Sequence, residues 1–444
     1  MRKLFSDNYK FLTWRKLWIY LCVALKKLGL DITEEQIDEM KANMYKIDYE
    51  TVRKEEEEVK HDVMAHIRAF AKLLPKSGGV LHLGATSCYV TDNADLIIQK
   101  EALNIIINKL KQVIKSLGRF AQKYRTMPAV GYTHYQPAQL VTVGKRACMW
   151  IQDFLSDLKE LSFMKREMKF LGAKGATGTQ ASYLQLFSGD KQSVINLDEI
   201  LTELCSFRKC FIISGQTYTR KQDEQLVKKI SGIATSVCKM STDIRLLAHD
   251  GEIYESFGAH QVGSSAMPYK KNPKNFEKLC GLAQVLINQC NTAQDVATSQ
   301  WLERTLNDSA ARRIYLPQVF LCADAMLDDL LNLCDKLEVN ELQISRNVQE
   351  HLPFMFTENV MMEMVKAGAN RQECHEKLRS ITIGAKFNGI ADNVNIEIIR
   401  KISEDPYFAP VHDSLQDLMS VEKIIGMAPY QVLAFLDEED IDDL

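Results

Sequence analysis

Apolar residues recur with helical spacing along most of this chain, and helix-breaking residues are rare, with only ten prolines in 444 residues. Three shorter periodic segments come first, at residues 13–28, from Thr33 onward and at 52–74. Thr33 and Gln36 have the spacing of a capping box, in which each side chain bonds the other residue's backbone N–H. We therefore expect three short helices before residue 75, the third carrying several glutamates on its early turns.

Five much longer helical segments follow, at residues 92–124, 138–171, 217–249, 276–300 and 309–336. A helix of about 30 residues spans roughly 45 Å, which is far longer than most globular helices. Apolar positions cover more than one face, as in residues 96–110, so each helix is expected to pack against several partners. The pattern predicts an all-α fold with a central bundle of five long helices, which also packs against other subunits. Pro317 is expected to kink the last helix.

The last hundred residues predict shorter helices, because turn-forming residues return there. The expected breaks are Pro353, Gly368, Gly384, Gly389, Pro406, Pro410, Gly426 and Pro429. We divide the chain into an N-terminal helical domain at 1–86, a central long-helix domain at 87–339 and a C-terminal helical domain at 340–444. The acidic stretch at 437–444 is expected to be solvated or frayed.

Composition excludes several classes of protein. Hydrophobic residues make up 46% and charged residues 25%, as in ordinary soluble globular proteins. The net charge of −3 argues against a general binder of nucleic acid or membrane surfaces, so any anion site must be local. No apolar run approaches the roughly 18 residues of a membrane span, and the first residues lack the apolar core of a signal peptide. The eleven cysteines include no Cys-x-x-Cys pair and no zinc spacing, which favours reduced thiols, a cytoplasmic location and no metal.

The segment 263–273 is the strongest candidate for chemistry. Glycine and serines make its front flexible, Pro268 and Pro273 stiffen its back, and Lys270 and Lys271 add two cations. Such a loop can close over an anion, although a solvated linker between helices has the same composition. The glycine-rich stretch 172–179 lacks the Gly-Lys-Ser/Thr ending of a nucleotide-binding P-loop, so we expect only a tight loop near the active cleft.

Residues 263–273 resemble the signature loop of the fumarase/aspartase superfamily, G-S-S-x-M-P-x-K-x-N. The Ala-Met-Pro-Tyr-Lys-Lys-Asn-Pro version is most similar to the adenylosuccinate lyase family of the animal type. Five further stretches are similar to that family, in the same order: 60–66, 81–88, 133–139, 215–220 and 303–309. The resemblance covers nearly the whole chain. It implies a three-domain fumarase/aspartase-like fold and a homotetramer whose active sites are each assembled from three subunits.

The resemblance also implies a reaction, the β-elimination of fumarate from adenylosuccinate, giving AMP, and from the succinyl-aminoimidazole-carboxamide ribotide of purine nucleotide biosynthesis. His134 then resembles the general acid that protonates the leaving nitrogen, and a histidine titrates in the range that this role needs. Ser264 resembles the general base, which needs positive charge and amide donors around it. Lys270 and Asn272 are placed to stabilise the aci-carboxylate. An acyl-enzyme role for Ser264 is disfavoured because no Gly-x-Ser-x-Gly elbow is present.

Other positions match supporting residues of the family. His61 resembles a substrate-binding and supporting residue, and Glu277 the glutamate that orients the catalytic histidine. The implied substrate-binding residues are Lys60, Asp62, Thr86, Ser87, Thr133, Gln216, Asn272, Lys278, Arg304, Ser309 and Arg313. Arg304, Ser309 and Arg313 fit a nucleotide phosphate, with Asp308 as the N-cap of their helix; a capped helix with surface arginines is the alternative. Lys278 stands where related sequences often have arginine, and so does Lys60, which removes a bidentate fork at each position.

Two further implications concern the limits of the resemblance. Related lyases carry an Arg-Tyr pair near the N-terminus that contacts the phosphate, and this chain has none before Tyr9. We expect either a truncated start or phosphate binding by the remaining groups. No cofactor is expected, because acid, base and charge-stabilising groups are side chains. The alternatives are another fumarate-releasing lyase, such as argininosuccinate lyase, or a non-catalytic helical scaffold. The remaining histidines are expected to be structural.

Overall fold

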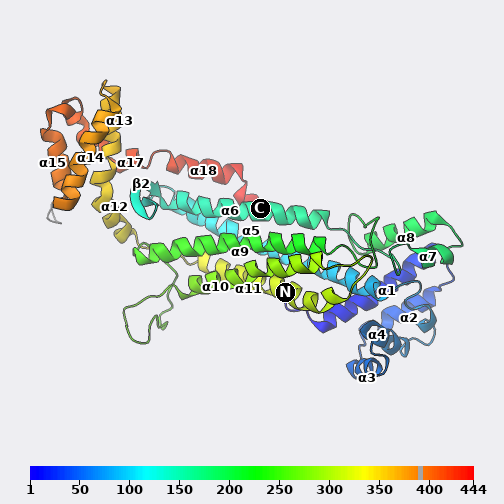
Figure 1. Ribbon diagram of the computed structural model, residues 1–444. Helices are drawn as coiled ribbons and strands as arrows, with labels where there is room; N and C mark the ends of the chain where they lie inside the picture. The colour runs from blue at the N-terminus through cyan, green and yellow to red at the C-terminus, as the bar shows by residue number, and fades with distance from the viewer. Residues whose placement is uncertain (389–393) are drawn as a thin grey trace. The chain divides into compact units, whose positions relative to one another are not determined.

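The computed structural model describes residues 1–388 and 394–444, and it is mostly helical (Figure 1). The expected all-α fold with five long helices is confirmed. These are α5 Ser87–Lys123, α6 Val143–Glu167, α9 Lys221–His249, α10 Lys274–Thr298 and α11 Asn307–Cys334. Pro317 lies inside α11 without ending it. In the described part of the chain, no helix has both the length and the apolar content to cross a membrane.

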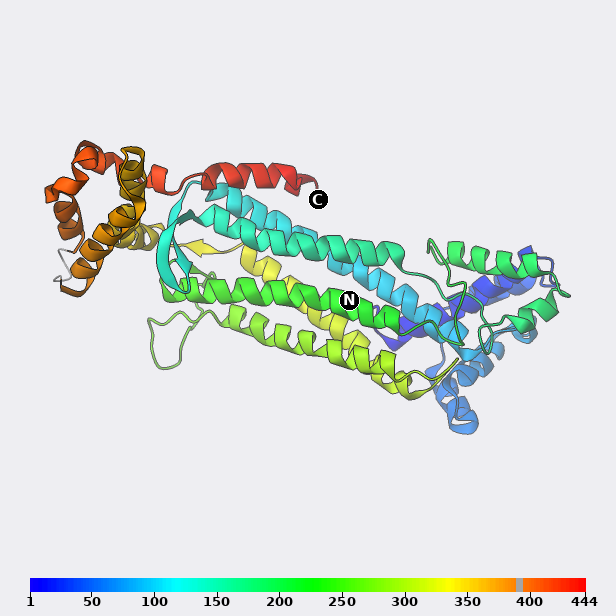
Figure 2. The same ribbon diagram turned by 45° about the horizontal axis from the view of Figure 1, so that its top comes forward.

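The chain forms two compact units, and each long helix contributes a segment to both. Unit 1 consists of 1–110, 156–237 and 281–328, and unit 2 of 111–155, 238–280 and 329–444. Within each unit the segments of the long helices lie side by side in both views (Figures 1 and 2). Apolar side chains on all of them are fully buried, as predicted from apolar positions on more than one face. The division into three domains at residues 86 and 339 stays a prediction.

Unit 1 also holds the N-terminal helices α1 Asp7–Lys27, α2 Glu34–Asn43, α3 Tyr49–Val59 and α4 Asp62–Ala71, the 3₁₀ turn Gly78–Val80, α7 Ala181–Leu186 and α8 Lys191–Leu204. The capping box of Thr33 and Gln36 is confirmed. The single helix expected over 52–74 is wrong. Lys60 adopts the left-handed conformation (φ 53°) and ends α3, and His61 then caps α4 by accepting a bond from the Met64 N–H.

Unit 2 contains a hairpin that the periodicity missed. Strands β1 Pro128–Thr133 and β2 Gln136–Thr142 pair antiparallel, with Thr133 opposite Gln136. The long helix expected from residue 138 therefore begins only at Val143. Pro137 lies in β2 opposite Tyr132, where the register shifts. A proline has no N–H to donate, so it is tolerated at such an irregularity in a ladder.

Short elements complete unit 2: β3 Ile253–Tyr254, β4 Glu338–Val339, α12 Glu341–Met355, α13 Thr357–Lys366, α14 Arg371–Asn388, α15 Val394–Glu404, the 3₁₀ segment Pro406–Ser414, α16 Leu415–Leu418, α17 Val421–Ile424, α18 Ala428–Glu438 and the 3₁₀ turn Ile441–Asp443. Pro353 lies inside α12 and does not break it. The break expected at Gly389 lies outside the described residues.

The acidic C-terminal stretch is mostly exposed, as its charge suggested, but its end is held against α5. Ile441 is buried against α5. A β-carbon added to Gly118 of α5 would stand only 2.7 Å from Ile441 Cγ2. The Asp442 carbonyl also accepts a bond of 2.9 Å from Lys115 Nζ. Ile441 and the Lys115–Asp442 bond together anchor the end of the chain on α5.

Candidate active site

The residues that sequence analysis singled out fall into two groups, one in each unit. Unit 1 holds Lys60, His61, Asp62, Thr86, Ser87, Gln216, Arg304, Ser309 and Arg313. Unit 2 holds Thr133, His134, Ser264, Lys270, Asn272, Glu277 and Lys278.

In unit 1, His61 lies beside the start of α5. The single helix expected over 52–74 would have placed it on the glutamate-rich helix instead. The Nδ1 of His61 accepts the Met64 N–H, and its Nε2 lies 3.2 Å from Ser87 Oγ, the first residue of α5. Because Nδ1 accepts, the ring proton belongs on Nε2, where it is donated to Ser87. Helix N-termini carry unpaired N–H groups and favour anions, so Thr86, Ser87 and His61 form a polar rim suited to a carboxylate.

Glycine lets the chain reach this rim. Gly84 has φ +71°, and a β-carbon there would stand 2.8 Å from the Tyr183 ring. A larger residue would be strained both by the backbone angle and by the ring. Residues 81–88 therefore make a tight turn against α7 before α5 begins.

Gln216 is held by three contacts. Its N–H donates to the Glu303 carbonyl (2.9 Å), its Nε2 to the Ala176 carbonyl (3.0 Å), and its Oε1 accepts from Cys88 Sγ (3.4 Å). A β-carbon on Gly215 would stand 2.4 Å from the Glu303 carbonyl oxygen. The Gln216 segment is therefore packed backbone to backbone against the segment that carries Arg304.

The glycine-rich stretch is part of the same packing. Gly178 has φ +85°, and a β-carbon there would stand 1.9 Å from the Ser214 carbonyl oxygen. Gly172 has φ +83°, and a β-carbon there would stand 2.3 Å from the side-chain oxygen Asp198 Oδ1. The glycines allow close backbone approach, which agrees with the tight loop that the missing P-loop ending had indicated.

The predicted phosphate group of unit 1 is arranged along the start of α11. Arg313 pairs with Asp62 at 3.1 Å, and Ser309 lies one turn before it. Arg304 donates from Nη1 to Asp308 Oδ1 at 2.8 Å. The N-cap role expected for Asp308 is wrong, because α11 begins at Asn307 and the buried Asp308 carboxylate is occupied by arginines.

Sequence analysis missed a buried ion network behind these residues. Arg220 contacts Asp92 (2.9 Å) and Asp308 (2.7 Å), while Arg312 contacts Asp223 (2.8 Å) and Asp95 (3.0 Å). Tyr218 and Gln99 complete the network by bonding Asp223. The signal was present as polar positions three, four or eight apart on otherwise apolar helices: Asp92, Asp95 and Gln99 on α5, and Asp308 and Arg312 on α11, with Arg304 just before it.

The network keeps Asp308 and Arg220 charged despite burial. Burial alone would raise the pKa of Asp308, but Arg220 and Arg304 outweigh it and hold that pKa below its usual value. Burial and the neighbouring Arg312 lower the pKa of Arg220, yet Asp92 and the other acids raise it overall. Buried charges survive only when they are paired in this way.

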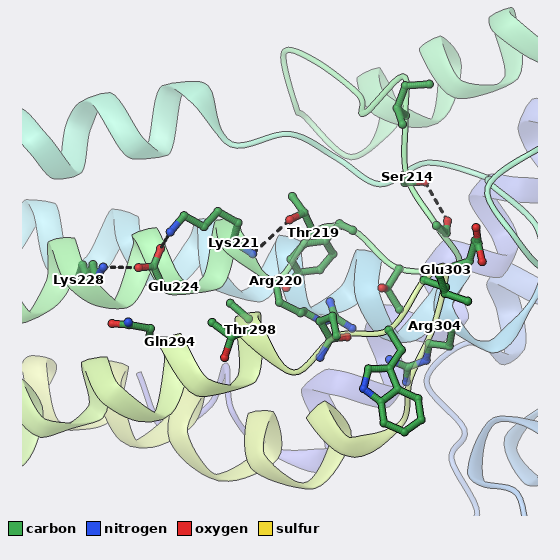
Figure 3. Close-up of a pocket in the computed structure, with 18 residues that line it drawn as sticks. Ser214, Thr219, Arg220, Lys221, Glu224, Lys228, Gln294, Thr298, Glu303 and Arg304 are labelled. Atoms are coloured by element: carbon green, nitrogen blue, oxygen red, sulfur yellow. Dashed lines mark hydrogen bonds and ion pairs between the residues drawn. The ribbon is translucent and has the colours of Figure 1, made fainter.

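A cavity of about 530 Å³ opens beside the network in unit 1 (Figure 3). Its walls come from residues 213–215 and 217–221 with Glu224 and Lys228, and from Gln294, 297–298 and 300–304. Arg304 is the sequence-predicted site residue among them. Lys221 and Lys228 both pair with Glu224, which reduces the positive charge of this wall.

In unit 2, His134 and Tyr135 form the turn of the hairpin between β1 and β2. Both residues have positive φ, 54° and 56°, which is the geometry of a two-residue hairpin turn that glycine or asparagine usually supplies. His134 is exposed, and Tyr135 Oη donates to the Asp250 carboxylate at 3.3–3.4 Å. A positive φ is uncommon for a residue other than glycine, and the role of His134 as general acid stays a prediction.

The signature loop of unit 2 folds back on itself, so that Asn272 and the backbone of Lys270 lie beside Gly263, the residue before Ser264. Ser264 Oγ accepts the N–H groups of Met267 (3.1 Å) and Ala266 (3.3 Å). Asn272 Nδ2 donates to the Gly263 carbonyl (3.0 Å). A β-carbon on Gly263 would stand 2.0 Å from the Lys270 carbonyl oxygen, so the two arms of the loop approach through a glycine.

The last two predicted residues of unit 2 lie on the first turns of α10. Glu277 lies 4.0 Å from Arg245 Nη2, and Lys278 pairs with Asp329 at 2.8 Å. The roles of Glu277 in orienting His134 and of Lys278 in binding substrate stay predictions. In the described residues, no group of three or more histidine, cysteine or acidic side chains could hold a metal ion.

Comparison with known proteins identifies the family. A model of the lyase family matches residues 6–287, and a model of the adenylosuccinate lyase C-terminus matches residues 353–435. A curated protein named adenylosuccinate lyase from Schistosoma mansoni is 45% identical over 98% of this chain and 91% of its own length. The protein of the same name from Saccharomyces cerevisiae is 44% identical over 99% of this chain and 92% of its own length.

Solved structures show the same fold at low identity. A 3-carboxy-cis,cis-muconate lactonizing enzyme from Pseudomonas putida has a TM-score of 0.84 at 21% identity, covering 99% of this chain and 96% of that one. A fumarate lyase from Mesorhizobium sp. BNC1 has a TM-score of 0.83 at 21% identity, covering 98% and 97%. These likenesses support the fumarase/aspartase-like fold, and the closer sequence relatives narrow it: the chain belongs to the adenylosuccinate lyase family.

Proposed function

We propose that this chain cleaves adenylosuccinate to AMP and fumarate, and the succinyl-aminoimidazole-carboxamide ribotide to its carboxamide and fumarate. The named relatives at 43–45% identity over nearly the whole chain support this substrate. The observation that carries the chemistry is Ser264, whose Oγ accepts two backbone N–H groups within a loop closed by Asn272.

The elimination needs a base, an acid and a place for negative charge. Ser264, as the alkoxide, removes the proton beta to the departing nitrogen, and its two amide donors favour the charged form. Electrons of that C–H bond move onto the neighbouring carboxylate, where Lys270 and Asn272 stabilise the aci-form. The C–N bond then breaks as His134 gives its proton to the nitrogen, so the products are fumarate and the free amine.

The unit 1 residues have binding roles in this proposal. Thr86 and Ser87, together with Thr133 and Gln216, hold the succinyl carboxylates, and His61 supports them beside Lys60 and Asp62. The helix start at Ser87 and the His61–Ser87 contact support the first part of this assignment. Arg304, Ser309 and Arg313 receive the phosphate, Glu277 orients His134, and Lys278 contacts substrate.

The proposed assembly is a homotetramer in the cytoplasm, with active sites shared between subunits. No cofactor is part of the scheme, because every step uses side chains of the protein. The division into N-terminal, central and C-terminal domains at 86 and 339 belongs to the same proposal.

The direct test is fumarate release, followed by absorbance, when the purified chain meets adenylosuccinate in the presence of a chelator. We expect release at an undiminished rate with the chelator, and none from argininosuccinate. Release from argininosuccinate alone would assign the chain to the other lyase reaction. Absence of release from adenylosuccinate and from the ribotide at high substrate would contradict the proposal and favour a scaffold.

A further inference from the structure

Arg304 of unit 1 is the outermost residue of a chain of ion pairs, named the relay, which runs through Asp92, Arg220 and Asp308. Its side chain is 22% exposed and lies at the cavity wall (Figure 3), and its Nη1 donates to Asp308 Oδ1 at 2.8 Å. The Asp308 side chain is 0% exposed, so this contact is shielded from solvent. A guanidinium has five N–H donors, and engaging one leaves a fork that can bind a planar or tetrahedral anion.

Asp308 is itself fixed. Its second oxygen, Oδ2, accepts Arg220 Nε at 2.7 Å, and Arg220 is gripped by both oxygens of Asp92, at 2.9 and 3.2 Å. Arg220 and Asp92 are buried. The order Asp92, Arg220, Asp308, Arg304 therefore alternates in charge from the core of unit 1 to the cavity, and each acid has its position set by two partners or a bidentate pair.

We propose that Asp308 and Arg220 are positioning residues for Arg304, which they hold in one rotamer with its remaining N–H donors available to the substrate phosphate. This rests on the proposed function, in which Arg304 contacts that phosphate. An arginine side chain that is mobile in the folded protein loses rotamer entropy when it binds an anion. A side chain already ordered by Asp308 has lost that entropy during folding. The relay thereby strengthens phosphate binding without touching the ligand.

Arg313 provides the contrast within the same predicted phosphate group. Its side chain is 60% exposed and pairs only with the partly exposed Asp62. A surface ion pair of this kind holds a long side chain weakly. The relay therefore acts on Arg304 specifically.

The test compares substrates with and without the phosphate, namely adenylosuccinate and its dephosphorylated nucleoside. Asp308→Asn keeps the shape of the side chain but removes its negative charge, which weakens its contacts with Arg220 and Arg304. We expect KM for adenylosuccinate to rise about tenfold with kcat retained, and KM for the nucleoside to stay unchanged. A merely structural role would alter both substrates alike. An equal change for both would overturn the proposal.

Asp95→Asn is the matched control, because Asp95 pairs with Arg312 in the same network and has no contact with Arg304 in the relay. It should leave the preference for the phosphorylated substrate unchanged, whereas a shift as large as that of Asp308→Asn would count against the relay. If Asp308→Asn fails to fold by circular dichroism, Arg220→Lys takes its place with the same expectation. An unchanged preference in that variant would overturn the proposal.

Calorimetric binding of AMP and adenosine repeats the comparison without turnover. The wild-type chain should bind AMP more tightly, and Asp308→Asn should lose about tenfold for AMP only. Retained discrimination in the variant would refute the positioning role. Because this readout needs no elimination chemistry, failure of the relay and failure of the proposed reaction give different results.

Discussion

The two groups of predicted site residues are held in opposite ways. In unit 1, Arg304 and Gln216 are fixed from behind by buried ion pairs and by glycine-mediated backbone packing. In unit 2, His134 lies exposed on a hairpin turn, and Ser264 lies in a loop whose recorded bonds are made within the loop itself. The first group rests on the core, and the second rests on its own local geometry.

This difference separates two tasks. Groups that recognise charge benefit from being fixed in advance, since ordering them later would cost binding energy. Groups that move protons must approach the reacting atoms closely and exclude water, which lids and loops achieve by closing. We therefore expect substitutions in unit 2 to reduce turnover with little effect on stability, and substitutions in the network of unit 1 to reduce stability or affinity.

The largest expected effect is on turnover. Ser264→Ala and His134→Ala should each lower kcat by about 10³-fold or more, because in the proposed mechanism each removes one partner of a proton transfer. Fumarate absorbance measures the rate, and light scattering checks that the assembly is unchanged. Ser265→Ala and His249→Ala are the neighbouring controls and should keep most activity. A near-normal rate in either main variant would remove that residue from the mechanism.

Next comes stability in the ion network of unit 1. Arg312→Ala leaves Asp223 and Asp95 without their arginine and should lower the free energy of unfolding by about 3–5 kcal/mol. Arg313→Ala, one residue later but exposed, should cost less than about 1 kcal/mol. Urea denaturation monitored by circular dichroism gives both values. Equal costs for the two arginines would show that the network contributes no special stability.

Two histidines, the buried His66 and the partly buried His82, make the stability of unit 1 depend on pH. Burial is the main reason that the pKa of His66 falls to about 4, and the same holds for His82, whose Nδ1 accepts the Trp18 indole N–H. Since the unfolded pKa is about 6.5, stability is complete above that pH and is lost as pH falls towards 4, by up to roughly 3 kcal/mol per histidine. His66→Leu should flatten the curve of unfolding free energy between pH 6.5 and 4. A curve that keeps its slope would contradict the burial argument.

The smallest expected change in stability is at the base of the signature loop. Asn272→Ala removes the bond to the Gly263 carbonyl and should cost less than about 1 kcal/mol, because the group is partly exposed. Turnover should nevertheless fall about tenfold if Asn272 stabilises developing charge. Paired measurements of melting temperature and kcat check this. A fall in stability without a fall in rate would reverse the contrast between the two units.

Local pattern accounts for most of the helices but not for their ends. The apolar periodicity of α5, α9, α10 and α11 placed each of them within a few residues, because a buried helix must repeat apolar positions. The hairpin before α6 was missed, since 138–142 continues an apolar pattern that a short strand and a helix start share. The break at Lys60 was missed because a lysine in the left-handed conformation ends α3, and a histidine, which is an unusual N-cap, starts α4.

The sequence by itself determined the helical architecture, the family and the residues to which chemistry can be assigned, because these depend on periodicity and on short ordered motifs. Only the tertiary structure showed that Asp92, Asp223 and Asp308, which lie far apart in the chain, share two buried arginines. It also placed His134 on a turn and Asp308 behind Arg304. Ion pairs across helices depend on the rotation and register of those helices, which burial of the whole core decides and no local pattern contains.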